Sequence, residues 1–174
     1  MDAQRDVLVT NHQQTLEFFV AGLQELSEPE VDAHEMLYNA SVLAHYAQVS
    51  TQSAMDLPAP ASLSAVFDCF VFDTSLANDS TMMETAGAQC LLLAGFFEDQ
   101  MRGRHNIRWY AQLGAAFYSR AAAHERRATK ARMMAAMAER FEPWRRRHAR
   151  LSRELRDQPF RLAMPAPPEP EGLV

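Results

Sequence analysis

Residues 83–122 read METAGAQCLLLAGFFEDQMRGRHNIRWYAQLGAAFYSRAA, and this stretch decides the fold class. Apolar residues recur every three or four positions on both sides of a short polar segment that contains Gly103 and Asn106. This period predicts two amphipathic helices, over about 82–101 and 107–122. Gly103 suits the position after a helix end, and Asn106 suits a helix N-cap. A connection this short predicts an antiparallel helical hairpin.

Small residues inside both helices predict that the hairpin packs closely. Gly95 and Gly114 lie mid-helix, where each costs about 1 kcal/mol relative to Ala. We expect that cost to be offset by a close approach of the two helices. The small residues expected at the contact are Gly87, Ala94 and Gly95 on the first helix and Ala111, Gly114 and Ala115 on the second.

The rest of the chain also has a helical period. Spacings of three and four predict further helices over about 11–26, 28–50, 62–77 and 125–156. Ser27–Glu30 and Thr81–Glu84 both have the capping-box pattern, which predicts that helices begin there. Pro143 lies inside the last apolar stripe and predicts a kink or a break at that point. The sequence therefore predicts an all-α, single-domain bundle of about five to seven helices.

The C-terminal residues differ from the rest in composition. Residues 158–174 hold five of the nine prolines, which predicts a flexible Pro-rich tail after a helical domain over 1–157. Met1 to Asp6 are polar and acidic and do not resemble a signal peptide. No apolar run approaches the roughly 20 residues that a membrane span needs. We therefore expect a cytoplasmic protein with no membrane partner, whose Cys69 and Cys90 are buried thiols.

The net charge of −5 hides two oppositely charged halves. Residues 1–101 carry one basic residue against 15 acidic ones, whereas residues 102–174 carry 16 basic residues against seven acidic ones. The basic helical region spans 102–156, and its densest part is the last helix. The candidate partner- or nucleic-acid-binding residues there are Arg145, Arg146, Arg147, Arg150, Arg153 and Arg156.

Three interpretations of this arginine-rich helix remain open. Its guanidinium groups could pair with the acidic half, either within one chain or across a homodimer, because a two-fold dimer would pair both patches twice. They could bind an acidic partner protein. They could also neutralise phosphates. We expect a non-enzymatic protein-interaction or regulatory module, and the alternative is a nucleic-acid-binding regulator that uses residues 140–156.

Signals for chemistry are weak in this sequence. None of the six histidines follows a Glu by three residues, and His34-Glu35 lacks the second His of a zinc-binding H-E-x-x-H motif. Neither a nucleophile elbow nor a glycine-rich phosphate loop is present. We therefore expect no enzyme activity, no metal and no cofactor. Phe96, Tyr110 and Tyr118 are aromatic residues that could line a small pocket, although such spacing is also typical of a core.

The segment GAQCLLLAGFF…WYAQLGAAFY resembles an uncharacterised family of bacterial all-helical proteins. The matching positions are Gly87, Leu91, Gly95, Phe96, Phe97, Tyr110, Gly114 and Tyr118. Weaker similarity extends to EMLYNASVLAHYAQ near residue 40 and to AERFEPW near residue 141, so that about two thirds of the chain is covered. Ala88 departs from the Asp of the family pattern, and Trp109 departs from its first Tyr. The resemblance implies an all-helical fold and assigns no activity.

Overall fold

The computed structural model of this chain describes residues 2–53 and 79–157, with side chains at 12–48 and 79–157. These residues form seven α-helices and one π-helical turn, which confirms the all-α prediction. In chain order they are α1 (Asp2–Glu25), α2 (Ala33–Ser53), α4 (Ser80–Leu91), the π-helical turn η3 (Leu92–Phe96), α5 (Glu98–Met101), α6 (Ile107–His124), α7 (Ala128–Glu139) and α8 (Phe141–Asp157). The helix expected over 62–77, Cys69 and the tail at 158–174 lie outside the described residues.

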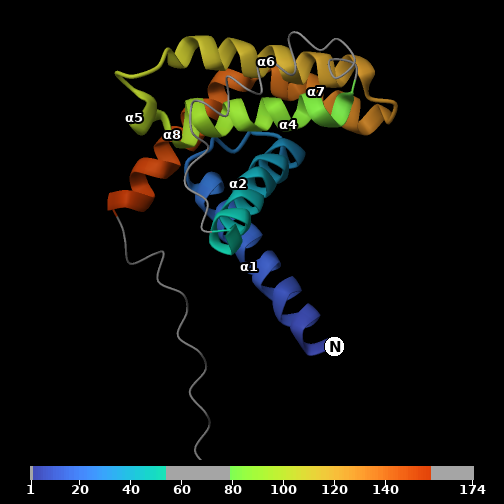
Figure 1. Cartoon of the computed structure of the whole chain (residues 1–174), viewed down its shortest axis with the longest axis vertical. Helices are drawn as coiled ribbons and strands as arrows, with labels where there is room; N and C mark the ends of the chain where they lie inside the picture. The colour runs from blue at the N-terminus through green and yellow to red at the C-terminus, as the bar shows by residue number, and fades with distance from the viewer. Residues whose placement is uncertain (1, 54–78, 158–174) are drawn as a thin grey trace, which may run out of the picture.

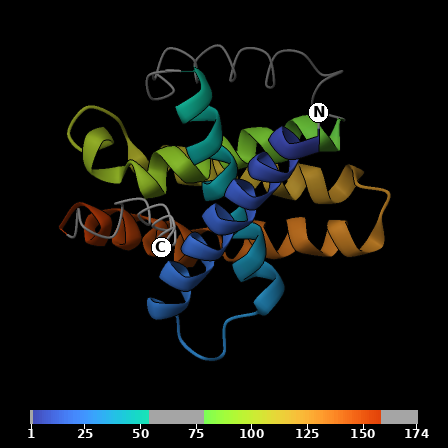
Figure 2. The same ribbon diagram turned by 90° about the horizontal axis from the view of Figure 1, so that it is seen from below.

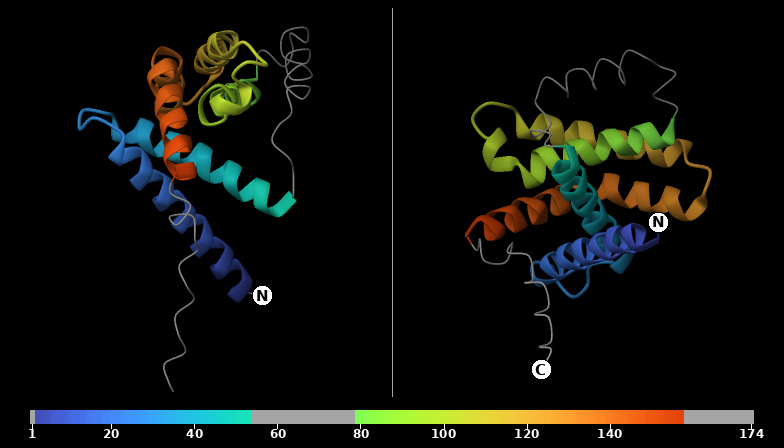
Figure 3. Two further views of the ribbon diagram at one scale, coloured as in Figure 1. Left: turned by 90° about the vertical axis from the view of Figure 1, so that its left-hand side faces the viewer. Right: turned by 60° about the horizontal axis from the view of Figure 1, so that its bottom comes forward.

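The helices form a single bundle with two layers. The helices α4, α6, α7 and α8 run roughly alongside one another, and α1 and α2 lie across them (Figure 1, Figure 2). The side view in Figure 3 shows α1 and α2 on one side of the other four helices. Contacts tie α1 to both α2 and α8, and α2 to α7. Within the described part of the chain, no helix is long and apolar enough to cross a membrane.

The hairpin of α4 and α6 forms as the sequence predicts. Gly103 has a φ of 85°, which favours glycine, and the Asn106 side chain accepts a hydrogen bond from the Trp109 N–H at 3.1 Å. A Cβ at Gly87 would lie 2.9 Å from the Tyr118 ring, so this glycine allows α4 and α6 to approach closely.

The expected continuous helix over 82–101 is wrong, because the chain passes through a π-helical turn. The Phe97 N–H bonds to the Leu92 carbonyl five residues earlier. Gly95 in this turn faces α8 and not α6, since a Cβ there would lie 3.0 Å from both the Arg145 carbonyl oxygen and the His148 Cβ. The Ala94 carbonyl also accepts a bond from Arg145 Nη1 at 3.0 Å. The turn is therefore the place where α8 packs against the hairpin.

Both capping boxes mark the wrong residue. The Asp32 carboxylate accepts bonds from the N–H groups of His34 and Glu35, so α2 begins at Ala33 and not near residue 28. In the same way, Asp79 caps α4 through the N–H groups of Thr81 and Met82. In each case an aspartate just before the helix supplies the oxygen that the first free N–H groups require.

The break expected in the last helical stretch occurs at Arg140, three residues before Pro143. Helix α7 ends at Glu139 and α8 begins at Phe141. Pro143 thus lies in the first turn of α8, where its missing N–H has no carbonyl partner to lose.

Candidate interaction surface

The most buried member of the arginine-rich helix is Arg145, which is only 9% exposed. Its guanidinium donates two bonds to the Glu142 carboxylate, at 2.9 and 2.7 Å, and one to the Ala94 carbonyl. Its Nη1 also lies 3.5 Å from a carboxylate oxygen of Glu98 on α5. The hydrogen bonds from Arg145 hold the pKa of Glu142 below its ordinary value. Arg145 is therefore part of the packing between α8 and the π-helical turn.

Arg153 and Arg156 also turn toward α5. Arg153 donates to Glu98 at 3.0 Å and to Asp99 at 3.4 Å, and Arg156 pairs with Asp99. The bond from Arg156, together with the charge of Arg153, lowers the pKa of Asp99. The acidic and basic halves of the sequence thus pair within one chain at this corner of the bundle.

The other three predicted arginines have partners on α8 itself. Arg146 donates to Glu142 at 3.0 Å, and Arg150 lies 3.7 Å from Glu154. The guanidinium of Arg147 lies 4.6 Å from the centre of the Trp144 ring, which is a cation–π contact. The side chains of Arg146 and Arg150 are 75% and 64% exposed, and exposed pairs of this kind contribute little to stability. All six predicted arginines nevertheless have intramolecular partners.

A second link between the halves joins α2 to α8 through Glu35, which is 3% exposed. Arg140 donates two bonds to its carboxylate, at 2.7 and 2.6 Å, and the Trp144 indole donates a third at 3.0 Å. Burial alone would raise the pKa of Glu35, but these bonds outweigh burial and the pKa lies below its usual value. The sequence gives no sign of this contact, since the two charges are more than 100 residues apart.

His148 lies beside this pair, at the centre of the bundle and fully buried. Its Nε2 lies 2.9 Å from the Asn39 side-chain oxygen, and its Nδ1 has no hydrogen-bond partner among the described residues. Burial lowers the pKa of His148 to about 3. The ring is therefore neutral at physiological pH and belongs to the core.

The three aromatic pocket candidates lie in different surroundings. Phe96 packs edge-on against Phe97, Tyr110 packs against its neighbours His105 and Trp109, and the fully buried Tyr118 contacts Tyr38 and Phe141. Among the described residues, no ring contact joins any two of these three side chains.

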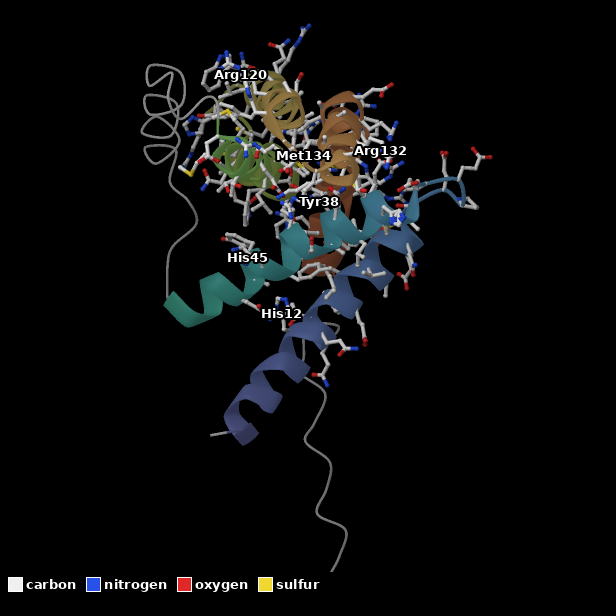
Figure 4. The ribbon with its side chains drawn as sticks, turned by 90° about the vertical axis from the view of Figure 1, so that its right-hand side faces the viewer. His12, Tyr38, His45, Arg120, Arg132 and Met134 are labelled. Carbon is white, nitrogen blue, oxygen red and sulfur yellow. The ribbon has the colours of Figure 1, made fainter. Side chains whose placement is uncertain are left out.

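Within the described part of the chain, arginines without partners lie upstream of α8. Residues 102–132 carry eight basic residues and one acidic residue, Glu125. Five exposed side chains in this range form no ion pair or hydrogen bond with any described residue, and they are Arg104, Arg108, Arg120, Arg126 and Arg132. Figure 4 shows Arg120 on the outer side of α6 and Arg132 on the outer side of α7. We call these five residues the free arginine set.

Signs of catalytic or metal chemistry are weak in the described residues. No group of three or more His, Cys, Asp or Glu side chains that could hold a metal ion occurs there. Cys90 is buried, and burial raises the pKa of its thiol to about 12, so this thiol is not an activated nucleophile.

Comparison with known proteins identifies no family. No protein-family model, no curated protein and no solved structure matches this chain. The fold and the surface together define an all-helical protein in which the arginines of the last helix contact carboxylates or an aromatic ring of the same chain. Among the described residues, its free positive charge lies on the α6–α7 hairpin and the loop that precedes it.

Proposed function

We propose that this protein is a non-enzymatic interaction module that binds an acidic partner protein through the free arginine set. The supporting observation is the contrast between two groups of arginines. Those of α8 are paired with carboxylates or an aromatic ring, whereas those of 102–132 include five exposed side chains with no partner in the described structure. Guanidinium groups bind carboxylates through paired hydrogen bonds, which makes them suited to an acidic protein surface.

An acidic protein fits this surface better than a nucleic acid does. The whole chain carries a net charge of −5, which repels a long polyanion at a distance. A protein presents a few carboxylates at close range and avoids most of that repulsion. Arginine is also enriched among the residues that dominate protein–protein binding. Nucleic-acid binding remains the alternative, now at the free arginine set as well as at residues 140–156.

Three expectations from the sequence belong to this proposal. The first is a cytoplasmic address, and the second is membership of the bacterial helical family that the segment at 87–118 resembles. The third is self-association, in which the acidic partner is a second copy of the chain. Exposed carboxylates for such a contact are present at Glu28 and Glu30 in the α1–α2 connection.

The proposal is tested by fluorescence anisotropy with a labelled peptide of about 15 residues that is rich in Glu. We expect binding at low salt that weakens as salt is added, and a loss of at least tenfold in affinity for Arg120→Ala/Arg126→Ala. The matched control is Arg146→Ala/Arg150→Ala, which removes exposed but paired arginines and should change binding less than threefold. Absence of binding at low salt would refute the proposal, and tighter binding of a single-stranded RNA or DNA oligomer would support the alternative.

A further inference from the structure

A shallow, open cleft lies among α1, α2 and the first turns of α7. Its volume is about 800 Å³, and its walls include the apolar side chains of Leu16, Leu37 and Met133. Leu37 is 51% exposed, which is the largest exposed fraction among the large apolar side chains of the described residues. Figure 4 shows Tyr38, the neighbour of Leu37 and also a wall residue, between α2 and the α6–α7 hairpin. Apolar surface that the fold leaves open in a concave place is typical of a binding site.

The cleft wall also carries a cation whose position is fixed. Lys130 is the only lysine of the chain, and its ammonium lies 2.6 Å from the Glu84 carboxylate. Glu84 also interacts with the Tyr38 hydroxyl, and that hydroxyl lies 3.1 Å from the hydroxyl of the fully buried Tyr118. The Glu84 carboxylate thus holds the ammonium at the wall. Only one of the three ammonium donors is needed for this pair.

Further positive charge lies beside the apolar walls. Arg127 lines the cleft. Arg126 and Arg132, which belong to the free arginine set, adjoin the cleft residues Arg127 and Met133 in the chain. The carboxylates close by, Glu84 and Glu125, are each paired with a cation. An occupant that complements this site therefore needs an apolar face and carboxylates beside it.

We infer that this cleft receives the apolar face of an acidic amphipathic helix of the partner protein. The inference rests on the proposed function and names the form of the partner at that surface. A helix in a groove places apolar side chains at i, i+3 or i+4, and i+7, and here they contact Leu16, Leu37 and Met133. Its flanking carboxylates lie toward Lys130, Arg126 and Arg132. The thioether of Met133 adapts readily to different apolar shapes, as methionines do at other such grooves.

The test uses the full chain and three labelled peptides of equal length and equal net charge. The first is an acidic helix with Leu at i, i+3, i+7 and i+10, the second has the same residues in scrambled order, and the third has Ala in place of every Leu. We expect the first peptide to bind at least tenfold more tightly than the other two. Leu37→Ser should remove that advantage and leave binding of the Ala peptide unchanged. Met82→Ser alters another exposed apolar side chain, which lies on α4 and outside the cleft, and should change neither.

The outcomes separate this inference from the proposed function. If all three peptides bind equally well and Leu37→Ser has no effect, the cleft inference is wrong and the arginine proposal stands. If none of them binds at low salt, both are wrong. A wild-type dimer that becomes monomeric in Leu37→Ser, seen by sedimentation velocity, would identify a second copy as the occupant and would overturn the inference.

Discussion

Replacement of His148 by Gln should remove a large part of the acid sensitivity of this fold. His148 is fully buried, and its only hydrogen-bond partner among the described residues is Asn39. Burial lowers its pKa from 6.5 to about 3. The unfolded chain therefore binds a proton at this residue well before the folded chain does. The glutamine side chain would keep an amide group near Asn39 but would have no proton to gain.

The size of the effect follows from proton linkage. The protonated form of histidine is the charged form, and the folded protein disfavours it when the pKa is lower in the folded state than in the unfolded chain. The neutral form of His148 therefore contributes its full stability above the unfolded pKa, and this contribution is lost as the pH falls from about 6.5 toward 3. At pH 5 the solution is about 1.5 pH units below the unfolded pKa of His148, and each unit corresponds to about 1.36 kcal/mol. We therefore expect His148 alone to cost about 2 kcal/mol of unfolding free energy between pH 7.5 and pH 5.

Urea unfolding followed by circular dichroism at both pH values measures this cost. The substitution can also change stability equally at every pH, so the relevant quantity is the change in stability between the two pH values. Carboxylates such as Glu35 and Glu142, whose pKa values are lowered, lose their contribution at still lower pH in both proteins. The wild type should lose about 2 kcal/mol more than His148→Gln. An equal loss in the two proteins would refute the buried, neutral state of His148.

Two further substitutions test the packing. Gly114→Ala should lower the free energy of unfolding by about 1–3 kcal/mol in the same urea assay, because a Cβ there would lie 2.5 Å from the Phe141 ring and 2.8 Å from Cys90 Cβ. The control is Gln112→Ala, at an exposed position of the same helix. A Gly114→Ala variant as stable as the wild type would contradict the close packing. Glu35→Gln should lower the free energy of unfolding, measured by thermal unfolding, by about 1–3 kcal/mol, because the Arg140 and Trp144 donors lose a charged acceptor. The control Glu139→Gln, at an exposed position, should lower it by less than about 0.5 kcal/mol. Similar losses in both variants would contradict the role of Glu35.

Local signals in the sequence predicted much of the fold. The apolar period indicated the helices, and Gly103 and Asn106 correctly placed the turn between α5 and α6. Errors arose where a tertiary contact decides the local structure. The π-helical turn depends on the approach of α8 to Gly95, which no pattern within residues 82–101 reveals. The helix starts were missed because Asp32 and Asp79 cap them in place of the hydroxyl residues of the two capping boxes.

The pairing of the arginines was only partly open to prediction. Arg146 with Glu142 and Arg150 with Glu154 are four residues apart on one helix, so these pairs can be read from the sequence. The pairing of Arg145 with Glu98 cannot be read from the sequence, because it depends on how distant helices pack. The free arginine set did leave a local signal: Arg108 and Arg120, for example, have no acidic residue three or four positions away in either direction.

Our central claim is that Arg145 of α8 stabilises the fold, whereas the free arginine set binds a partner. It is tested most directly by measuring thermal stability and Glu-rich peptide binding on the same two variants. We predict that Arg145→Met lowers the unfolding temperature by about 4–8 °C, which corresponds to about 2 kcal/mol for a chain of this size, and that it still binds the peptide below its unfolding temperature. Arg120→Ala/Arg126→Ala should keep the wild-type unfolding temperature and lose most of the binding. The reverse pattern, with binding lost in Arg145→Met and retained in Arg120→Ala/Arg126→Ala, would contradict the claim.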